Sequence, residues 1–157
     1  MNSYESICRF RRAAAASEDC LVIAHWNDAD WASFAALCQP LAIEAGDALI
    51  TTGYTEQSLF LVCAGAVEVV HVARPTLTVS TVSRVPAGSI VGEQAFFDAS
   101  PRSANVWALD DCELLRIDLH DYQRYAQTEP RRAFDFSFAL GRVLAQRLRA
   151  TTARIGA

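Results

Sequence analysis

Short apolar segments alternate with polar turns through the middle of the chain, between about residue 43 and residue 117. Several of these segments are rich in β-branched and aromatic side chains, which favour strands. After a strand that ends near Ile43, the predicted strands are Leu49–Thr52, Ser58–Cys63, Ala66–Val72, Leu77–Val85, Asn105–Leu109 and Glu113–Ile117. Regularly spaced short strands that end in glycine turns are typical of antiparallel barrels and jelly rolls. The pattern therefore predicts a mainly β domain of this kind.

The first forty residues have a helical pattern instead. Four apolar side chains recur there every three or four residues, as one face of a helix requires. They are Trp31, Phe34, Leu37 and Leu41. Asp28 or Asp30 is the expected N-cap of this helix, and Pro40 is expected to end it.

The last forty residues predict two further helices. Asp118 is the expected cap of a helix over Leu119–Gln127, and Pro130 precedes a long helix over Arg131–Ile155. One apolar stripe of the long helix consists of Phe134, Phe138, Gly141, Leu144, Leu148, Thr151 and Ile155. A second stripe, in its first half, consists of Phe136, Leu140 and Val143. We interpret one stripe as packed on the domain and the other on a second copy, which predicts a two-fold dimer. The alternative is one wide core face in a monomer.

Composition limits the protein to an ordered domain with few special chemistries. The chain has 157 residues, 52% hydrophobic and 20% charged, so we expect residues 1–157 to form a single domain. Within it we place N-terminal helices at 1–40, a β-roll at 41–117 and C-terminal helices at 118–157. The net charge of −4 gives no electrostatic basis for non-specific nucleic-acid binding.

Cysteine usage and hydropathy bear on the compartment. The five cysteines are Cys8, Cys20, Cys38, Cys63 and Cys112, without any C-x-x-C pair. Reduced thiols fit this spacing better than a disulfide framework or a zinc site, so we predict no metal. No apolar run approaches the ~20 residues of a membrane span, so we expect a cytoplasmic protein that does not bind membranes.

The segment Gly92–Ala104 combines groups that bind a phosphate and a sugar. Gly92 allows a close approach of the backbone, Glu93 supplies a carboxylate, and a short helical turn presents backbone N–H groups. Arg102 adds a guanidinium, which binds a phosphate through two parallel hydrogen bonds. The alternative for Arg102 is a surface ion pair with Asp98 or Glu93.

The same segment carries a family resemblance. Gly92-Glu93, the apolar run Ala95–Phe97 and Pro101–Ala104 resemble the phosphate-binding cassette of cyclic-nucleotide-binding domains. This is the family of bacterial catabolite activators, kinase regulatory subunits and nucleotide-gated channels. The resemblance extends from Leu41 to about Ile155, and Gly46, Gly53 and Gly65 are similar to the turn glycines of the family. It implies an α+β, mainly β fold: an eight-stranded antiparallel β-roll or jelly roll with N-terminal helices, a short cassette helix and a long C-terminal helix.

The resemblance also implies a ligand, a cyclic mononucleotide. Arg102, Ser103 and backbone N–H groups would bind its phosphate, and Glu93 its ribose hydroxyl. Thr151 and Thr152 match a hydroxyl pair that meets adenine in catabolite activators, although small residues at a helix seam are an alternative. The predicted ligand-binding residues are Gly92, Glu93, Gln94, Ala95, Arg102, Ser103, Ala104, Thr151 and Thr152.

The identity of the base rests on a few positions. The threonine pair favours cAMP. Ser103 stands where alanine is typical of cAMP sites and threonine of cGMP sites, so cGMP stays open. Gln94 and Asn105 depart from the family pattern and can shift the choice towards another cyclic nucleotide.

We expect a regulatory sensor, not an enzyme, with no cofactor besides its ligand. In transcription factors of this family a helix-turn-helix domain follows the long helix, whereas this sequence ends at Ala157. We therefore expect no DNA binding and an effector protein as partner, and we interpret the basic residues of the long helix as a solvated face.

Rival classes have weaker support. A cupin-type metal enzyme needs two or three converging histidines, and only His71 falls on a predicted strand. A haem or iron–sulfur sensor needs ligand clusters that this cysteine spacing does not offer. An interaction module of the same fold stays an alternative. Such a module would either bind no ligand or bind a different one, cGMP or a cyclic dinucleotide.

Overall fold

The computed structural model of the chain describes residues 1–17, 20–73 and 78–156. The helices are α1 (Ser3–Ala14), α2 (Asp28–Leu37), α3 (Glu93–Asp98), α4 (Leu119–Thr128) and α5 (Pro130–Ile155). The strands are β1 (Gln39–Ile43), β2 (Ala48–Ile50), β3 (Ser58–Ala64), β4 (Ala66–Ala73), β5 (Thr78–Pro86), β6 (Ile90–Val91), β7 (Ala104–Ala108) and β8 (Cys112–Asp118). Leu77, the predicted first residue of the fifth strand, lies outside the described residues.

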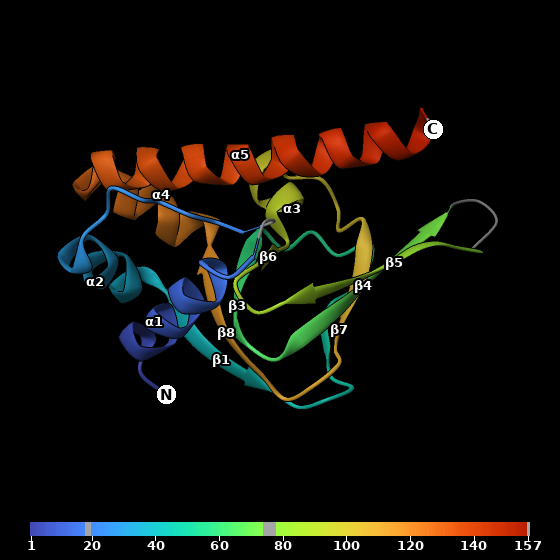
Figure 1. The fold of residues 1–157 in the computed structure, drawn as a ribbon, viewed down its shortest axis with the longest axis horizontal. Helices are drawn as coiled ribbons and strands as arrows, with labels where there is room; N and C mark the ends of the chain where they lie inside the picture. Colours follow the sequence, from blue (N-terminus) through green and yellow to red (C-terminus); the bar gives the residue numbers. More distant parts are fainter. Residues whose placement is uncertain (18–19, 74–77, 157) are drawn as a thin grey trace.

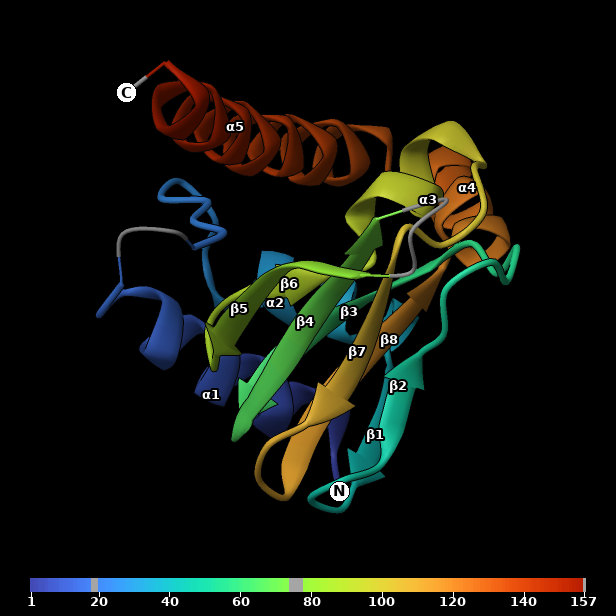
Figure 2. The same cartoon turned by 90° about the vertical axis from the view of Figure 1, so that its right-hand side faces the viewer.

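The strands form two antiparallel sheets of four, in the orders β1-β8-β3-β6 and β2-β7-β4-β5 (Figure 2). The second sheet includes the long hairpin of β4 and β5, in which Val67 is paired with Val85. The predicted fold class, a mainly β antiparallel roll with helices at both ends, is confirmed.

The apolar alternation of the strands produces two cores. Leu59 and Leu61 of β3 pack against the helices, whereas Phe60 and Val62 of the same strand pack inside the roll. Side chains of successive residues on a strand point to opposite faces, so β3 is buried on both. The core inside the roll consists of Ile50, Phe60, Val62, Val67, Val91, Val106, Ala108, Cys112 and Leu114.

Two predicted boundaries near the N-terminus were wrong. The helix ends at Leu37, and Pro40 and Leu41 belong to β1, which lies at the edge of its sheet, where a proline is tolerated. Its N-cap is Asn27, whose side chain accepts a hydrogen bond from the Asp30 amide while the Asp30 carboxylate accepts one from the Asn27 amide. Asp30 is thus the second partner of a capping box and not the cap.

Helix α5 runs the length of the molecule, from α4 to the side that carries the β4–β5 hairpin (Figure 1). The first half of α5 packs on the domain through Phe136, Leu140 and Val143, which are buried in the helical core. The other stripe includes Phe134, Phe138, Leu148 and Ile155, which are all exposed.

The basic residues of α5 are only in part the solvated face that the sequence predicted: four are exposed (Arg131, Arg142, Arg149 and Arg154), whereas Arg132 and Arg147 are half-buried. Arg131 and Arg132 both donate to the buried carboxylate of Asp30, at 2.9 Å each. The Arg142 guanidinium lies over the Phe138 ring. The first turn of α5 is therefore joined to α2 by a buried carboxylate shared between two arginines.

Candidate functional site

A cavity of about 910 Å³ lies between the second sheet, the cassette helix α3 and the last turns of α5. Its apolar wall is made by side chains of the roll, and its polar wall by the segment Gly92–Ala104. The apolar residues are Ile50, Val69, Val85, Val91 and Val106. Its size lies at the upper end of the ~300–1,000 Å³ that is usual for small-molecule sites.

Arg102 is the buried cation of this cavity, with 4% of its surface exposed. Its Nη1 donates to the Gly92 carbonyl at 3.0 Å, and its Nη2 donates to the Ser58 carbonyl at 2.6 Å. Its Nε is buried and has no hydrogen-bond partner among the residues that the structure describes. Burial lowers the pKa of this guanidinium, while the carboxylates of Glu56 and Glu93 oppose that effect. An arginine stays charged under such conditions, so the cavity contains a buried positive charge. The surface ion pair considered as an alternative is wrong.

Gly92 makes the position of Arg102 possible. Its φ of +83° lies in the left-handed region that favours glycine. A Cβ atom at this residue would lie 2.8 Å from Arg102 Nη1 and 2.9 Å from the Ser58 carbonyl oxygen. The guanidinium can therefore reach the carbonyl of residue 92 only because that residue has no side chain.

Glu93 is held by a residue of α5. The Arg147 Nη1 donates to Glu93 Oε1 at 2.9 Å, and its Nη2 donates to the Ile90 carbonyl at 3.0 Å. Glu93 is buried, with 7% of its surface exposed, and it lines the cavity together with Arg147. The last turns of α5 are thereby joined to the cassette by a carboxylate–guanidinium pair.

The other predicted residues fall into two groups. Gln94, Ala95, Ser103 and Ala104 line the cavity, and the Ser103 hydroxyl donates to Gln94 Oε1 at 3.0 Å. Thr151 lines it from α5. Thr152 is exposed and outside the cavity lining, and its hydroxyl donates to the Leu148 carbonyl of its own helix.

Arg147 and Ser58 were missed at the sequence level. Arg147 precedes Thr151 by four residues, and residues four apart share one face of a helix, so the predicted role of Thr151 was a signal for it. For Ser58 no local signal existed, because its carbonyl reaches Arg102 only through the folded arrangement of β3 and the cassette.

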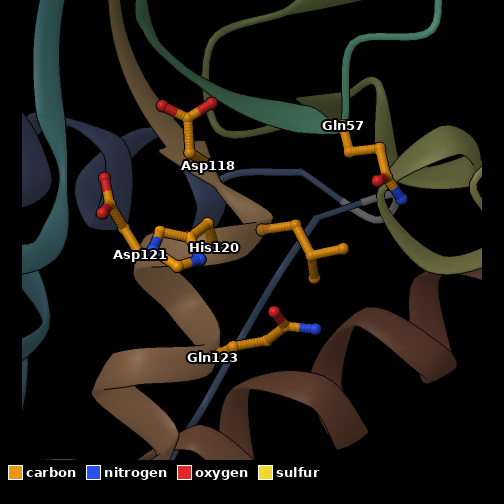
Figure 3. A pocket seen from close by; sticks show the side chains of 6 residues that line it. Gln57, Asp118, His120, Asp121 and Gln123 are labelled. Carbon is orange, nitrogen blue, oxygen red and sulfur yellow. The ribbon is translucent and has the colours of Figure 1, made fainter.

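A second, smaller cavity of about 340 Å³ lies where β8 runs into α4 (Figure 3). It is lined by Gln57, Asp118, Leu119, His120, Asp121 and Gln123. Asp118 accepts from Arg116, and Asp121 accepts from Gln39 and Arg124. In Figure 3 the labelled side chains spread apart and do not converge on one point. The side chains of this cavity are therefore not arranged to bind one ligand together.

Two features are absent from the described part of the chain. Within residues 1–17, 20–73 and 78–156, no three His, Cys, Asp or Glu side chains gather where they would hold a metal ion. Among the helices of those same residues, none combines the length and the apolar character needed to cross a membrane.

A family model matches more than half of the chain. The family model of the cyclic nucleotide-binding domain matches residues 40–129. Glutaminase 1 of Bradyrhizobium diazoefficiens is 30% identical over 124 residues, which are 79% of this chain and 19% of the glutaminase. The chain thus spans about a fifth of the length of this relative.

Two solved structures share the fold. A cyclic nucleotide-binding domain of Methylobacillus flagellatus superposes with a TM-score of 0.85 at 20% identity, over 98% of this chain and 84% of that one. The catabolite activator protein of Thermus thermophilus superposes with a TM-score of 0.74 at 23% identity, over 85% of this chain and 60% of that one.

Proposed function

Because the chain belongs to the cyclic nucleotide-binding domain family, we propose that it is a sensor whose cavity binds a 3′,5′-cyclic mononucleotide, with cAMP as the first candidate and cGMP as the second. The observation that carries this proposal is the buried guanidinium of Arg102. Its Nη atoms donate to carbonyls, and its Nε donor lacks a partner within the described residues. A buried cation of this kind is matched best by an anion that enters the cavity.

The cyclic phosphate is assigned to the cassette. Arg102 supplies the charge and the Nε donor, and the hydroxyl of Ser103 lies on the same wall of the cavity. The first N–H groups of α3 have no intrahelical acceptor, so the amides that follow Gly92 are donors to the same anion. These groups bind a monoanion without any metal.

The ribose is assigned to Glu93. A carboxylate accepts a hydrogen bond from the ribose 2′-hydroxyl, and Glu93 has a second oxygen besides the one that binds Arg147. In this proposal Arg147 keeps its bond to Glu93 and fixes the carboxylate for the sugar. In this proposal α5 closes over the ligand. This movement and the binding of the ribose then depend on the same two residues, Glu93 and Arg147.

The base is assigned to the α5 side of the cavity. Thr151 lines that side, and its hydroxyl can accept from the amino group of adenine. Thr152 is assigned to the ligand of a second copy, in the two-fold dimer that the sequence predicts. Gln94 and Ser103, which bond each other, are the positions at which cGMP or another cyclic nucleotide would be favoured.

The signal is proposed to travel through aromatic contacts between three helices. Phe96 of α3 contacts Tyr122 of α4, with ring centroids 5.5 Å apart, and Tyr122 contacts Phe136 of α5 at 5.7 Å. A ligand that draws α3 inward changes the packing of these three aromatic rings. The position of α5 changes with it. Such a ligand shifts the population towards the conformation to which it binds more tightly.

The effector is proposed to be an enzyme. The similarity to glutaminase 1 is the basis for this, because that relative is named as an enzyme and this chain spans only a fifth of its length. The proposed output is a change in the α5 surface that the enzyme contacts.

Isothermal titration calorimetry with cAMP, cGMP and a cyclic dinucleotide tests the ligand. We expect wild type to bind a cyclic mononucleotide with micromolar or lower Kd, and Arg102→Ala to lose at least about 2 kcal/mol of binding free energy. Arg102→Lys keeps the charge but not the planar fork, so it should bind between the two. Arg149→Ala, on an exposed part of α5, is the matched control and should bind as wild type.

Thermal unfolding of each variant establishes that it is folded. If wild type binds none of these nucleotides, or if folded Arg102→Ala binds as tightly as wild type, the proposal is wrong. Tight binding of the cyclic dinucleotide alone would favour the differently liganded module.

A further inference from the structure

A polar network continues from Arg102 to residues outside the cavity lining. The Ser58 carbonyl and hydroxyl oxygens both accept from Arg102 Nη2, at 2.6 and 3.4 Å. The Ser58 hydroxyl in turn donates to Glu56 Oε1 at 2.8 Å. The second oxygen of Glu56 lies 4.0 Å from Arg102 Nη2. Glu56, which precedes β3, is thus within ion-pair distance of the buried guanidinium.

The same carboxylate serves a second arginine. Arg116 Nη2 of β8 lies 2.8 Å from Glu56 Oε1 and also donates to Asp118 Oδ1 at 2.8 Å. Asp118 is the N-cap residue of α4, and its side chain makes no capping hydrogen bond there. Arg116 therefore keeps one carboxylate, that of Asp118, even when Glu56 is neutral.

Arg102 has less choice of counter-ions. The carboxylates that act on its charge are those of Glu56 and Glu93. Glu93 is engaged by Arg147 at 2.9 Å, so its charge is largely balanced. Glu56 remains as the carboxylate that balances the buried charge of Arg102 when no anion is bound, although it shares its own charge with Arg116.

We propose that Glu56 is the resident counter-ion of Arg102 and that it sets the affinity of the cavity for an anionic ligand. This inference rests on the proposed function and adds a residue outside the cavity lining. Glu56 stabilises the protein before the cyclic phosphate binds. Once the phosphate is bound, two negative charges share one guanidinium, and each stabilises the complex less.

The sign of the effect separates this role from simple positioning. If Glu56 acts as a competing charge, its neutralisation lowers the stability of the protein without ligand and tightens ligand binding. If Glu56 only orients Arg102, its neutralisation weakens binding. Glu56→Gln is the appropriate change, because its amide oxygen can still accept from the Ser58 hydroxyl while the charge is removed.

Calorimetry with cAMP and cGMP, at low and at high salt, tests the proposal together with thermal unfolding without nucleotide. We expect Glu56→Gln to unfold at a lower temperature than wild type and to bind about two- to fivefold more tightly, the range of a partly exposed ion pair. Because the side chain of Glu56 is 42% exposed, the gain should shrink as salt screens its charge. Glu113→Gln removes a carboxylate that pairs with Arg9 and should leave the affinity unchanged.

Each outcome decides a separate point. Unchanged or weaker binding by Glu56→Gln, with binding by wild type intact, overturns the counter-ion role and leaves the proposed function standing. Tighter binding that does not depend on salt also overturns it. The absence of binding by wild type overturns both.

Discussion

Arg102 and Gly92 form one unit, since the guanidinium of one bonds the carbonyl of the other at 3.0 Å. Chemistry at the level of single residues explains why both were predicted. The planar fork of an arginine fits a phosphate through two hydrogen bonds. A backbone at positive φ with a side chain packed closely on it favours glycine. Arg147 was missed because its partner Glu93 lies 54 residues away in the sequence. The packing of α5 on the cassette brings the two together, and the local signal for it was the spacing of four residues between Arg147 and Thr151.

Gly92→Ala tests this unit. The left-handed backbone costs an alanine roughly 1–2 kcal/mol, and its Cβ would also overlap Arg102 Nη1 and the Ser58 carbonyl. Gly46 is the matched control, because it too has positive φ but no atom within 4 Å of an added Cβ. By chemical denaturation, Gly92→Ala should lose at least about 1 kcal/mol more than Gly46→Ala.

Ligand affinity provides the second measurement on the same pair. Gly92→Ala should weaken binding of the cyclic nucleotide by about tenfold or more, since about 1.4 kcal/mol corresponds to that factor. Gly46→Ala should bind as wild type. Equal losses of stability in the two variants would contradict this prediction. They would show that Arg102 moves away from the new methyl group without a further loss of folding free energy.

At the scale of elements, the strands show which parts of the fold a local sequence pattern can predict. The predicted strand at Ser58 was found in place because its residues alternate between two apolar cores. The strand β6 was missed, since two residues, Ile90 and Val91, are too few to show a period. Pro40 was assigned to a helix end because Leu37 and Leu41 fit a helical period. Pairing with β8, which places Pro40 opposite Leu115, decided otherwise.

Asp30 joins two such elements, α2 and α5, and predicts a pH dependence. Hydrogen bonds from the Asn27 amide and from Arg132 hold the pKa of this carboxyl below its usual value. Its stabilisation is therefore fully present above the unfolded pKa of about 3.9 and is lost as pH falls through the lower folded value. Asp30→Asn should lower Tm at pH 7, and its difference from wild type should shrink as the pH falls below about 4.

Asp28→Asn is the control, since Asp28 occupies the same first turn but is 80% exposed in its pair with Arg11. Both substitutions remove a negative charge from the N-terminus of α2, so the helix dipole contributes to each alike. Thermal unfolding followed by circular dichroism at both pH values makes the comparison. A loss in Asp28→Asn as large as that in Asp30→Asn would contradict the role of the buried carboxylate.

At the scale of the whole molecule, α5 has one face in the core and one in solvent. Phe134, Phe138, Leu148 and Ile155 are between 55% and 81% exposed, along one side of a helix of 26 residues. Monomeric proteins rarely expose large contiguous apolar surface, so this side of α5 fits an interface. The two stripes seen in the sequence thus differ in burial, as a dimer requires, while the dimer itself stays a prediction.

The test of the dimer must leave the core intact. Removing α5 would also remove Phe136 and Leu140, which are fully buried, so a truncated chain would fail for reasons unrelated to association. Exchanging exposed side chains avoids this. We expect wild type to sediment as a dimer, and the double variant Phe134→Glu, Leu148→Glu to sediment as a folded monomer, because four like charges would meet across a two-fold seam.

Tyr54→Ser gives the matched control, since Tyr54 is as exposed as Phe134, 66% in both, and lies in the loop between β2 and β3. It should remain dimeric. The comparison also bears on the ligand, because Thr152 lies outside the cavity lining of its own chain and its proposed role is to contribute a hydroxyl to a second copy. If so, the monomeric variant binds cAMP more weakly than wild type, and Thr152→Ala weakens binding in the dimer but not in the monomer. A wild type that sediments as a monomer would refute the interface and with it the proposed role of Thr152.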